Sequence, residues 1–199
     1  MQGVRRLRRS ELPVATVELA RFLIGKTLVH ERSRRTLSGR IVETEAYVVG
    51  DAAAHSFRGL TASNRSLFLE YGHAYVYFTY GNHFMLNISS EREGVGAGIL
   101  FRALEPLEGI KTMKRHRGTD RVLDLTRGPG RLAAALGITK KLDGLDLCAD
   151  GPLWLGTAVR ETGSIGMSVR IGITREAHRE LRFYERGNLF VSGPKKLSP

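Results

Sequence analysis

Two acidic residues and one aromatic residue alternate along residues 40–47, which read Arg-Ile-Val-Glu-Thr-Glu-Ala-Tyr. On the two-residue period of a β-strand, Ile41, Glu43, Glu45 and Tyr47 point to one face. Burying an unpaired carboxylate is expensive, so these acids are poor choices for a face that only packs a core. The pattern predicts a surface on which a general base lies beside a flat ring.

The two carboxylates leave two interpretations open on spacing alone. Glu43 and Glu45 lie roughly 7 Å apart along such a strand, and a carboxylate pair is typical of enzymes that cleave glycosidic bonds. Alternatively, one or both acids form surface ion pairs with Arg40 or another arginine of the chain. The residues around the pair have to distinguish a catalytic role from a structural one.

Four of the six tyrosines crowd two predicted strands, namely Tyr47, Tyr75, Tyr77 and Tyr80. Tyr75 and Tyr77 point the same way, whereas Tyr80 lies at a hairpin corner and points the other way. Such rings can be ordinary core residues with satisfied hydroxyl groups. Flat rings also grip an unstacked base, and an aromatic side chain at a tight turn can fill the gap that the base leaves in a duplex.

The charge of the chain favours a polyanionic partner. Lysine and arginine number 31 against 20 aspartate and glutamate residues, which gives a formal charge of +11. A merely soluble basic surface would have the same composition. An acid, a slot between flat rings, a wedge and positive charge together indicate an enzyme that flips a base out of nucleic acid.

Other kinds of chemistry find little support in the residue types. Cys148 is the single cysteine, which excludes an internal disulfide and a cysteine-based zinc site and favours a reducing compartment. The six histidines show no metal-ligand spacing, and motifs for a serine nucleophile or a phosphate-binding loop are absent. We therefore expect no metal, no cofactor and acid–base chemistry by a carboxylate. No apolar run reaches the ~18 residues of a membrane span, so we expect no membrane partner.

The elements that position these residues follow from hydrophobic period and turn signals. Helices are predicted at residues 13–24, at 128–136 and from Pro106 onward; strands are predicted at residues 26–30, 40–47, 74–80, 84–89, 99–104, 153–155, 169–173 and 181–184, with a turn at 31–38 and a loop at 49–65. The pattern predicts a single α+β domain over residues 1–199, a mostly antiparallel curved β-sheet with surrounding helices and a protruding β-hairpin. Residues 1–10 would form a flexible basic arm and residues 194–199 a flexible tail.

The sequence resembles the alkyladenine (3-methyladenine) DNA glycosylase family of base-excision repair over nearly the whole chain. Five blocks carry the resemblance in one order, at residues 39–47, 54–56, 75–81, 87–90 and 102–106. The resemblance implies a monofunctional glycosylase that flips alkylated or deaminated purines out of duplex DNA. Its substrates would include 3-methyladenine, 7-methylguanine, hypoxanthine and ethenoadenine, and its product would be an abasic site without strand cleavage.

The resemblance also implies the catalytic pair. Glu45 falls at the position of the general base that activates the attacking water, and Arg102 at that of an arginine that helps to position this water. An opposite charge favours the ionised form of an acid, so we expect Arg102 to favour ionised Glu45. Glu43 is left with a supporting or structural role.

The residues implied for substrate recognition lie on the strands and the loop around this pair. Tyr47 would stack on one face of the flipped base, and His55 and Tyr77 would close the other, with the main chain of His55 reading the base edge. Asn87 falls where an asparagine crowds the exocyclic amino group of normal guanine. Tyr80 falls at the wedge that enters the minor groove.

Contacts with the DNA backbone are expected from Asn82 and His83 at the hairpin corner and from Gly130 and Arg131. The last two open a predicted helix, whose free N–H groups suit a phosphate. The sequence departs from the family in two places: Asn82 replaces a methionine beside the wedge, and residues 61–65 lack the usual proline. These departures concern the grip on DNA and leave the catalytic pair intact.

The partner implied by the resemblance is double-stranded DNA that contains damaged purines. A water-shielded pocket and the lack of an apolar helix typical of a dimer interface favour a monomer. The protein would then be cytoplasmic, at the nucleoid, in a bacterium and nuclear in a eukaryote. Two other functions stay open on the residues themselves, a non-catalytic nucleic-acid-binding module of the same fold and a carbohydrate hydrolase that uses Glu43 and Glu45. The combination of Glu45 with Arg102 favours the enzyme, and a basic surface is of little use for neutral sugars.

Overall fold

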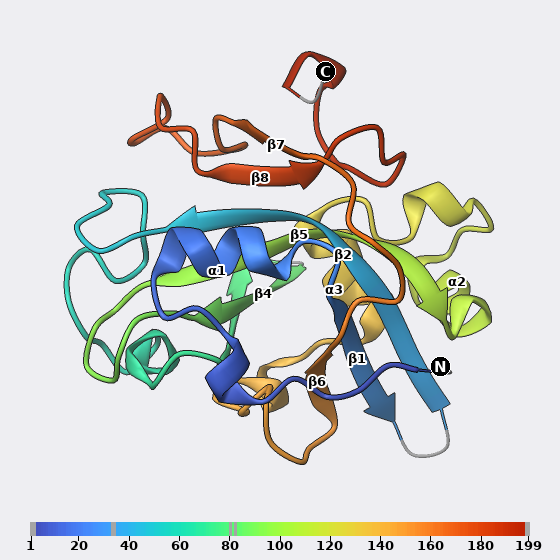
Figure 1. Cartoon of the computed structure of the whole chain (residues 1–199), viewed down its shortest axis with the longest axis horizontal. Coiled ribbons are helices and arrows are strands. Elements are labelled where there is room, and N and C mark those ends of the chain that lie inside the picture. The colour runs from blue at the N-terminus through green and yellow to red at the C-terminus, as the bar shows by residue number, and fades with distance from the viewer. Residues whose placement is uncertain (1–2, 33–34, 80, 82, 198–199) are drawn as a thin grey trace.

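A curved antiparallel β-sheet organises the chain in the computed structural model, which describes residues 3–32, 35–79, 81 and 83–197 (Figure 1). Six strands lie in the order β3-β4-β5-β2-β1-β6, and β8 pairs with β2 and β7. The strands are β1 (Thr27–Arg32), β2 (Arg35–Tyr47), β3 (Ala74–Thr79), β4 (His83–Ser89), β5 (Gly98–Glu108), β6 (Leu153–Gly156), β7 (Ile165–Ser168) and β8 (Arg182–Glu185). This arrangement confirms the predicted α+β class.

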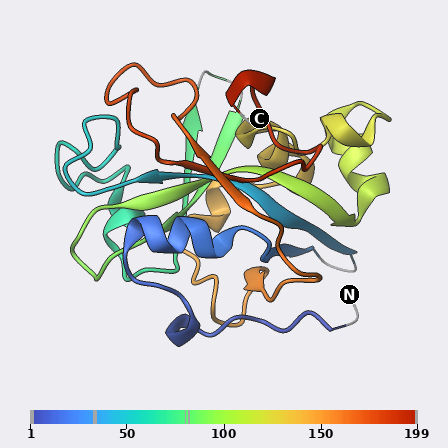
Figure 2. The same cartoon turned by 45° about the horizontal axis from the view of Figure 1, so that its top comes forward.

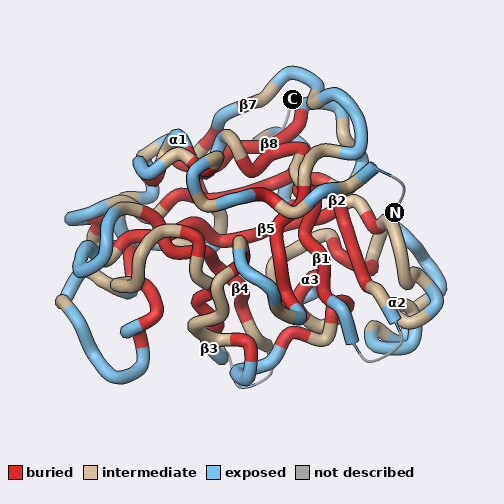
Figure 3. The backbone as a smooth tube through the Cα atoms, turned by 60° about the horizontal axis from the view of Figure 1, so that its bottom comes forward, coloured by how far each residue is buried: buried red, intermediate tan, exposed pale blue. Residues whose placement is uncertain are grey.

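Strand β2 is the centre of the sheet because three strands pair with it. β5 runs along one edge of β2, while β1 pairs with residues 35–40 and β8 with residues 43–45 on the other edge. Residues 43–45 therefore lie between two strands and are buried, as is most of the sheet in Figure 3. The predicted catalytic strand is thus the most enclosed part of the sheet.

Helices cover both faces of this sheet (Figures 1 and 2). Helix α1 (Thr16–Leu23) packs on β2 and β5, whereas α3 (Pro129–Leu136) packs on β4 and β5 with α2 (Ile110–Arg117) beside it. Gly25 (φ +87°) follows α1, and α3 begins at Pro129 and ends before Gly137 (φ +68°), as the proline and glycine signals predict. Single turns of 3₁₀ helix lie at Arg9–Glu11, Arg65–Phe68, Val122–Asp124, Lys140–Leu142 and Lys195–Leu197.

The β3–β4 hairpin protrudes from the sheet, as predicted. β3 and β4 pair along the whole hairpin, but β5 pairs with β4 only at residues 87–89. The outer half of the hairpin therefore extends beyond its neighbouring strand. Tyr80 and Asn82, predicted at its corner, lie outside the described residues.

Three predicted boundaries are wrong. Pro106 lies inside β5 and opens no helix, and α2 begins at Ile110 instead. Pro106 faces Gly39 at a register shift between β2 and β5, where a strand tolerates a residue without an N–H group. β1 and β2 extend into the predicted turn at residues 31–38, and residues 169–173 form a loop after β7 rather than a strand.

The even alternation predicted for β2 breaks next to Glu43. The register against β5 shifts on both sides of this residue, as in a β-bulge. Ile41 packs in the hydrophobic core, whereas Glu43 and Glu45 both contact Arg102. The common face predicted from Ile41 onward therefore holds only from Glu43 to Tyr47.

Residues 3–10, expected to form a flexible basic arm, lie against β6. The N–H of Leu7 donates to the carbonyl of Leu155 at 2.9 Å, and Arg5 forms an ion pair of 2.8 Å with Glu11. Part of the positive charge in this segment is therefore balanced within the molecule.

Candidate active site

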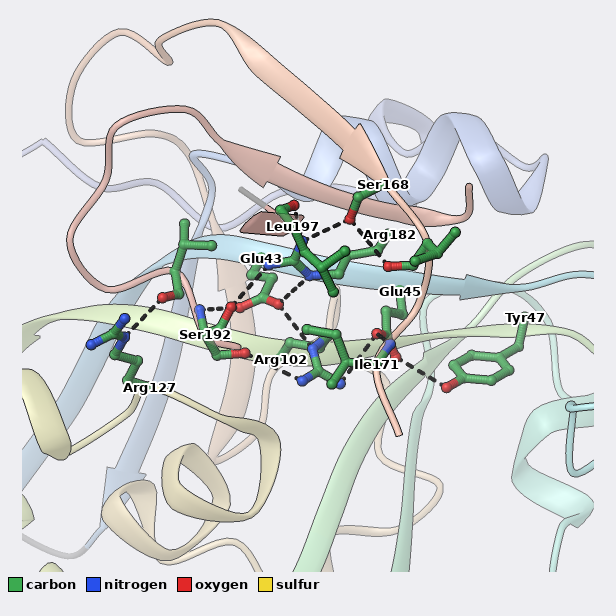
Figure 4. Close-up of polar contacts among 12 residues, drawn as sticks. Glu43, Glu45, Tyr47, Arg102, Arg127, Ser168, Ile171, Arg182, Ser192 and Leu197 are labelled. Carbon is green, nitrogen blue, oxygen red and sulfur yellow. Dashed lines mark hydrogen bonds and ion pairs between the residues drawn. The ribbon is translucent and has the colours of Figure 1, made fainter. Parts of the chain in front are cut away.

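Glu45 is a fully buried carboxylate that two hydrogen bonds and one ion pair hold in place (Figure 4). Its Oε1 accepts the N–H of Ile171 at 2.7 Å and lies 3.2 Å from Nη1 of Arg102. Its Oε2 accepts the hydroxyl of Tyr47 at 3.0 Å. The partners come from its own strand β2, from β5 and from the loop after β7, so two distant segments help to fix this side chain. The predicted base does lie beside a flat ring.

Arg102 joins Glu45 to Glu43. Its Nε donates to Glu43 at 2.9 Å, and its Nη2 donates to the hydroxyl of Ser192 at 3.2 Å. Glu43 also accepts Nε–H of Arg182 and the N–H of Ser192, each at 2.6 Å. The two acids are therefore not equivalent, because Glu43 is bound entirely within a charged network.

Burial raises the pKa of Glu45 above its ordinary value, and the nearby charge of Glu43 adds to the rise. Arg102 does favour the ionised form, as predicted, together with the N–H of Ile171 and the hydroxyl of Tyr47. These interactions do not outweigh burial. Active sites commonly raise the pKa of a carboxyl in this way, since it then serves better as a base near neutral pH.

A cavity of about 350 Å³ opens against the partners of Glu45. Tyr47, His55, Tyr77 and Arg102 line it, whereas Glu45 lies behind this wall with no exposed surface. The rings of His55 and Tyr77 are 4.3 Å apart between centroids and meet edge to face. The volume is near the lower limit for small-ligand sites, which suits a single flat base.

Asn87 lines the same cavity, and the aromatic wall holds it. Its Nδ2 donates to the carbonyl of Tyr75 at 3.3 Å, and the Tyr75 hydroxyl lies 3.0 Å from Nδ1 of His55. Burial lowers the pKa of His55, so its ring is uncharged at neutral pH. An uncharged ring does not repel a positively charged ligand.

Arg170 and Asp51 were not indicated by the sequence and brace this wall from behind. They form an ion pair in which both side chains are fully buried. The guanidinium of Arg170 also lies 4.6 Å from the ring centroid of Tyr47. The pair ties the loop that carries His55 to the loop that carries Ile171. The available signal is an arginine between Val169 and Ile171, a pattern that predicts a strand there.

Asn64 was also missed, and it stabilises the loop that lacks the family's proline. Its side chain is buried. Nδ2 donates to the carbonyls of His55 (2.9 Å) and Gly59 (3.0 Å), and Oδ1 accepts the N–H of Thr61 at 2.7 Å. A single amide therefore closes the loop and fixes the main chain of His55.

The start of α3 lies against the hairpin, near the residues predicted to contact the DNA backbone. A Cβ on Gly130 would lie only 3.0 Å from the ring of His83, so the two segments touch. Arg131 is half exposed and pairs with Asp124 at 3.2 Å. A second cavity of about 420 Å³, lined by Arg127 and Arg131 among others, shares Arg102 with the first.

Other reactive groups are few within the residues described. There, no group of three or more His, Cys, Asp or Glu side chains is placed to hold a metal ion. No helix in the same ranges is long and apolar enough to cross a membrane. Burial raises the pKa of the Cys148 thiol to about 11, so it is not a ready nucleophile at neutral pH.

The family model and the similar proteins described below all point to one family. The family described as Methylpurine-DNA glycosylase matches residues 10–189. A protein of Mesorhizobium japonicum named "Putative 3-methyladenine DNA glycosylase" is 65% identical over 189 residues, which cover 95% of this chain and 91% of that protein. Proteins with the same name from Paraburkholderia phytofirmans and Methanoculleus marisnigri are 53% and 48% identical, over 96% and 89% of this chain and 90% and 93% of their own.

Proposed function

The chain belongs to the methylpurine-DNA glycosylase family, whose members are hydrolases of the N-glycosyl bond, and from this we propose that it removes damaged purines from duplex DNA. The proposed substrates are alkylated or deaminated purines, such as 3-methyladenine, 7-methylguanine, hypoxanthine and ethenoadenine. The observation that carries the proposal is the buried Glu45, held by Arg102 behind a cavity with aromatic walls.

Glu45 is the general base of this reaction. Its carboxylate takes a proton from a water whose oxygen forms the new bond to C1′ of the deoxyribose. The bond between C1′ and the purine nitrogen breaks, and its electron pair leaves with the base. A purine alkylated at N3 or N7 carries positive charge, so it accepts this pair and departs neutral. Hypoxanthine and ethenoadenine are neutral in the nucleotide, so their departure as neutral bases also requires protonation of the base. A positioned base contributes about 10²–10⁴-fold to such a step.

The water needs access to Glu45, which has no exposed surface. The N–H of Ile171, Nη1 of Arg102 and the Tyr47 hydroxyl occupy its oxygens. A carboxylate can accept about four hydrogen bonds, so Oε2 has room for a further donor once a neighbouring group moves to admit water. The Tyr47 hydroxyl is the natural one to move, because the ring of Tyr47 lines the cavity and stacks on the incoming base.

The cavity selects a damaged purine by shape and charge. Flipping a nucleotide costs a few kcal/mol, least at a damaged pair, and stacking returns roughly 1–3 kcal/mol per base. The rings of Tyr47 and Tyr77 attract a cationic base through cation–π interaction, and an uncharged His55 does not oppose it. Asn87, on the same wall, crowds the exocyclic amino group of normal guanine and so helps to exclude it.

Binding to the duplex uses the protruding hairpin and the start of α3. Tyr80 is the wedge that fills the gap left by the flipped nucleotide. Asn82, His83, Gly130 and Arg131 contact the DNA backbone. The protein acts as a monomer, and its charge of +11 gives an affinity that falls with salt.

Two other functions fit these residues less well. A non-catalytic nucleic-acid module has no need of a buried carboxylate with a raised pKa. A carbohydrate hydrolase needs two available carboxyl groups, and Glu43 is fully engaged by Arg102, Arg182 and Ser192. The network around Glu43 therefore argues against the pair of acids that the sequence spacing suggests.

The direct test is base release from duplex oligonucleotides that each contain one lesion. We expect free modified base and alkali-labile abasic sites with enzyme in excess, little release from undamaged duplex, and no strand cleavage before alkali. Binding to lesion duplex without release of any lesion would favour the non-catalytic module.

A further inference from the structure

Glu43 is a buried carboxylate whose three hydrogen-bond partners all lie far from it in sequence. Its side chain is fully buried. Arg102 and Arg182 each donate Nε–H to its Oε1, at 2.9 and 2.6 Å, and the main-chain N–H of Ser192 donates to its Oε2 at 2.6 Å. Burial with this number of partners holds the Glu43 carboxylate in one orientation.

The guanidinium of Arg102 is held by two hydrogen bonds and one ion pair, each through a different nitrogen. Nε meets Glu43, Nη1 meets Glu45 at 3.2 Å, and Nη2 meets the hydroxyl of Ser192 at 3.2 Å. A planar fork bound at all three nitrogens cannot rotate without losing a partner. Without Glu43, the Nε end would be free and the plane could turn.

From this geometry we propose that Glu43 is a positioning residue for base release, holding Arg102 in the plane that aims it at Glu45 and at the attacking water. This inference rests on the proposed function. Ser192 contacts both Arg102 and Glu43 and so belongs to the same network. It lies beyond residues 10–189, the part of the chain that the family comparison matches. The C-terminal segment therefore completes the catalytic pair.

Electrostatics gives Glu43 a second effect that an experiment can detect. The groups that face the two acids are Arg102 on β5, Arg182 on β8, Tyr47 on β2 and the N–H groups of Ile171 and Ser192. The negative charge of Glu43 opposes ionisation of Glu45. Arg102 also forms ion pairs with both acids, so its positive charge is divided between them. Removing that charge while keeping the shape should make Glu45 easier to ionise.

The test compares Glu43→Gln with a matched control, Glu185→Gln. Glu185 is also a buried glutamate bound by an arginine, with Nη2 of Arg40 at 2.7 Å, but it does not contact Arg102 or Glu45. Single-turnover base release is measured against pH for both variants and the wild type, together with the Kd for lesion duplex. Glu43→Gln should lower the plateau rate roughly 10²-fold, the scale of a ~1 Å misplacement. It should also move the acid limb of the pH–rate profile, where the rate rises with pH, to lower pH at unchanged Kd. Glu185→Gln should keep the plateau rate and the acid limb of the wild type.

A wild-type plateau and limb in Glu43→Gln would overturn the inference, and so would equal rate losses in both variants without a shift of the limb. Should Glu43→Gln fail to fold, Ser192→Ala decides, because it removes one acceptor of Arg102 and no charge. A lowered rate at unchanged Kd and melting temperature supports the inference, and the wild-type rate overturns it. An inactive wild type would instead refute the proposed function.

Discussion

The sharpest test of how the cavity is built is Asn64→Ala. Asn64 makes three hydrogen bonds to main-chain groups of its own loop, at His55, Gly59 and Thr61. Alanine removes all three and leaves the loop without its internal closure. Because His55 forms part of the cavity wall, we expect the loss to appear as weaker binding of the flipped base.

The size of the effect follows from the number of bonds. Three hydrogen bonds at about 1 kcal/mol each amount to about 3 kcal/mol. If binding has to supply all of this to order the loop, the Kd rises roughly 140-fold, at tenfold per 1.4 kcal/mol. The loop is near solvent and water can replace part of the loss, so we expect an increase between roughly 10-fold and 140-fold.

The assay is the Kd for a lesion duplex by fluorescence anisotropy, with hydrogen exchange of residues 55–64 followed in the free protein. Ser63→Ala is the control, because Ser63 lies in the same loop and its exposed hydroxyl hydrogen-bonds to the side chain of Thr61. Asn64→Asp should be at least as damaging as alanine, since it places an acceptor against two carbonyls. A Kd for Asn64→Ala that matches the control would refute the reasoning.

Three further predictions concern acid stability, pH dependence and selectivity. Burial alone would raise the pKa of Glu185, but hydrogen bonds led by that from Arg40 lower it to about 2. The stability that this lowered pKa gives the fold is fully present above pH 4.5 and is lost as pH falls toward 2. The difference in unfolding free energy between wild type and Glu185→Gln, measured by urea titration, should therefore be about 3 kcal/mol smaller at pH 2 than at neutral pH. A difference that stays constant with pH would contradict this prediction. Because the pKa of Glu45 is raised, release of 7-methylguanine should increase with pH through a midpoint above that of an ordinary glutamate, and a midpoint at or below the ordinary value would be inconsistent with the buried base. Asn87→Ser should increase release of normal guanine from undamaged duplex. Guanine release by this variant at the background rate would show that Asn87 has no role in selectivity.

Local signals in the sequence predict much of this fold, and non-local ones account for the errors. Pro129 and Gly137 mark the ends of α3 within a few residues of chain, so that helix is predicted correctly. Pro106 carries the same local signal for a helix start, yet it lies in β5. Its place depends on a register shift opposite Gly39, which no neighbouring residue announces.

The same distinction applies to the site. Glu45 and Tyr47 are two positions apart, so the two-residue period of a strand predicts that they lie on the same face. Their hydrogen bond confirms this prediction. The family resemblance adds His55, Tyr77, Asn87 and Arg102, which share one cavity wall with Tyr47. The residue that binds Oε2 of Glu43 lies 149 positions away, and no spacing rule could indicate it.

Base release by Glu45→Gln tests the central claim most directly. Glutamine keeps the size of the side chain and removes the charge that accepts the proton, so the account predicts loss of base release with lesion binding retained. Single-turnover release from a duplex that contains one alkylated purine measures the first, and anisotropy on the same duplex measures the second. Release by Glu45→Gln at the wild-type rate would contradict the assignment of Glu45 as the general base.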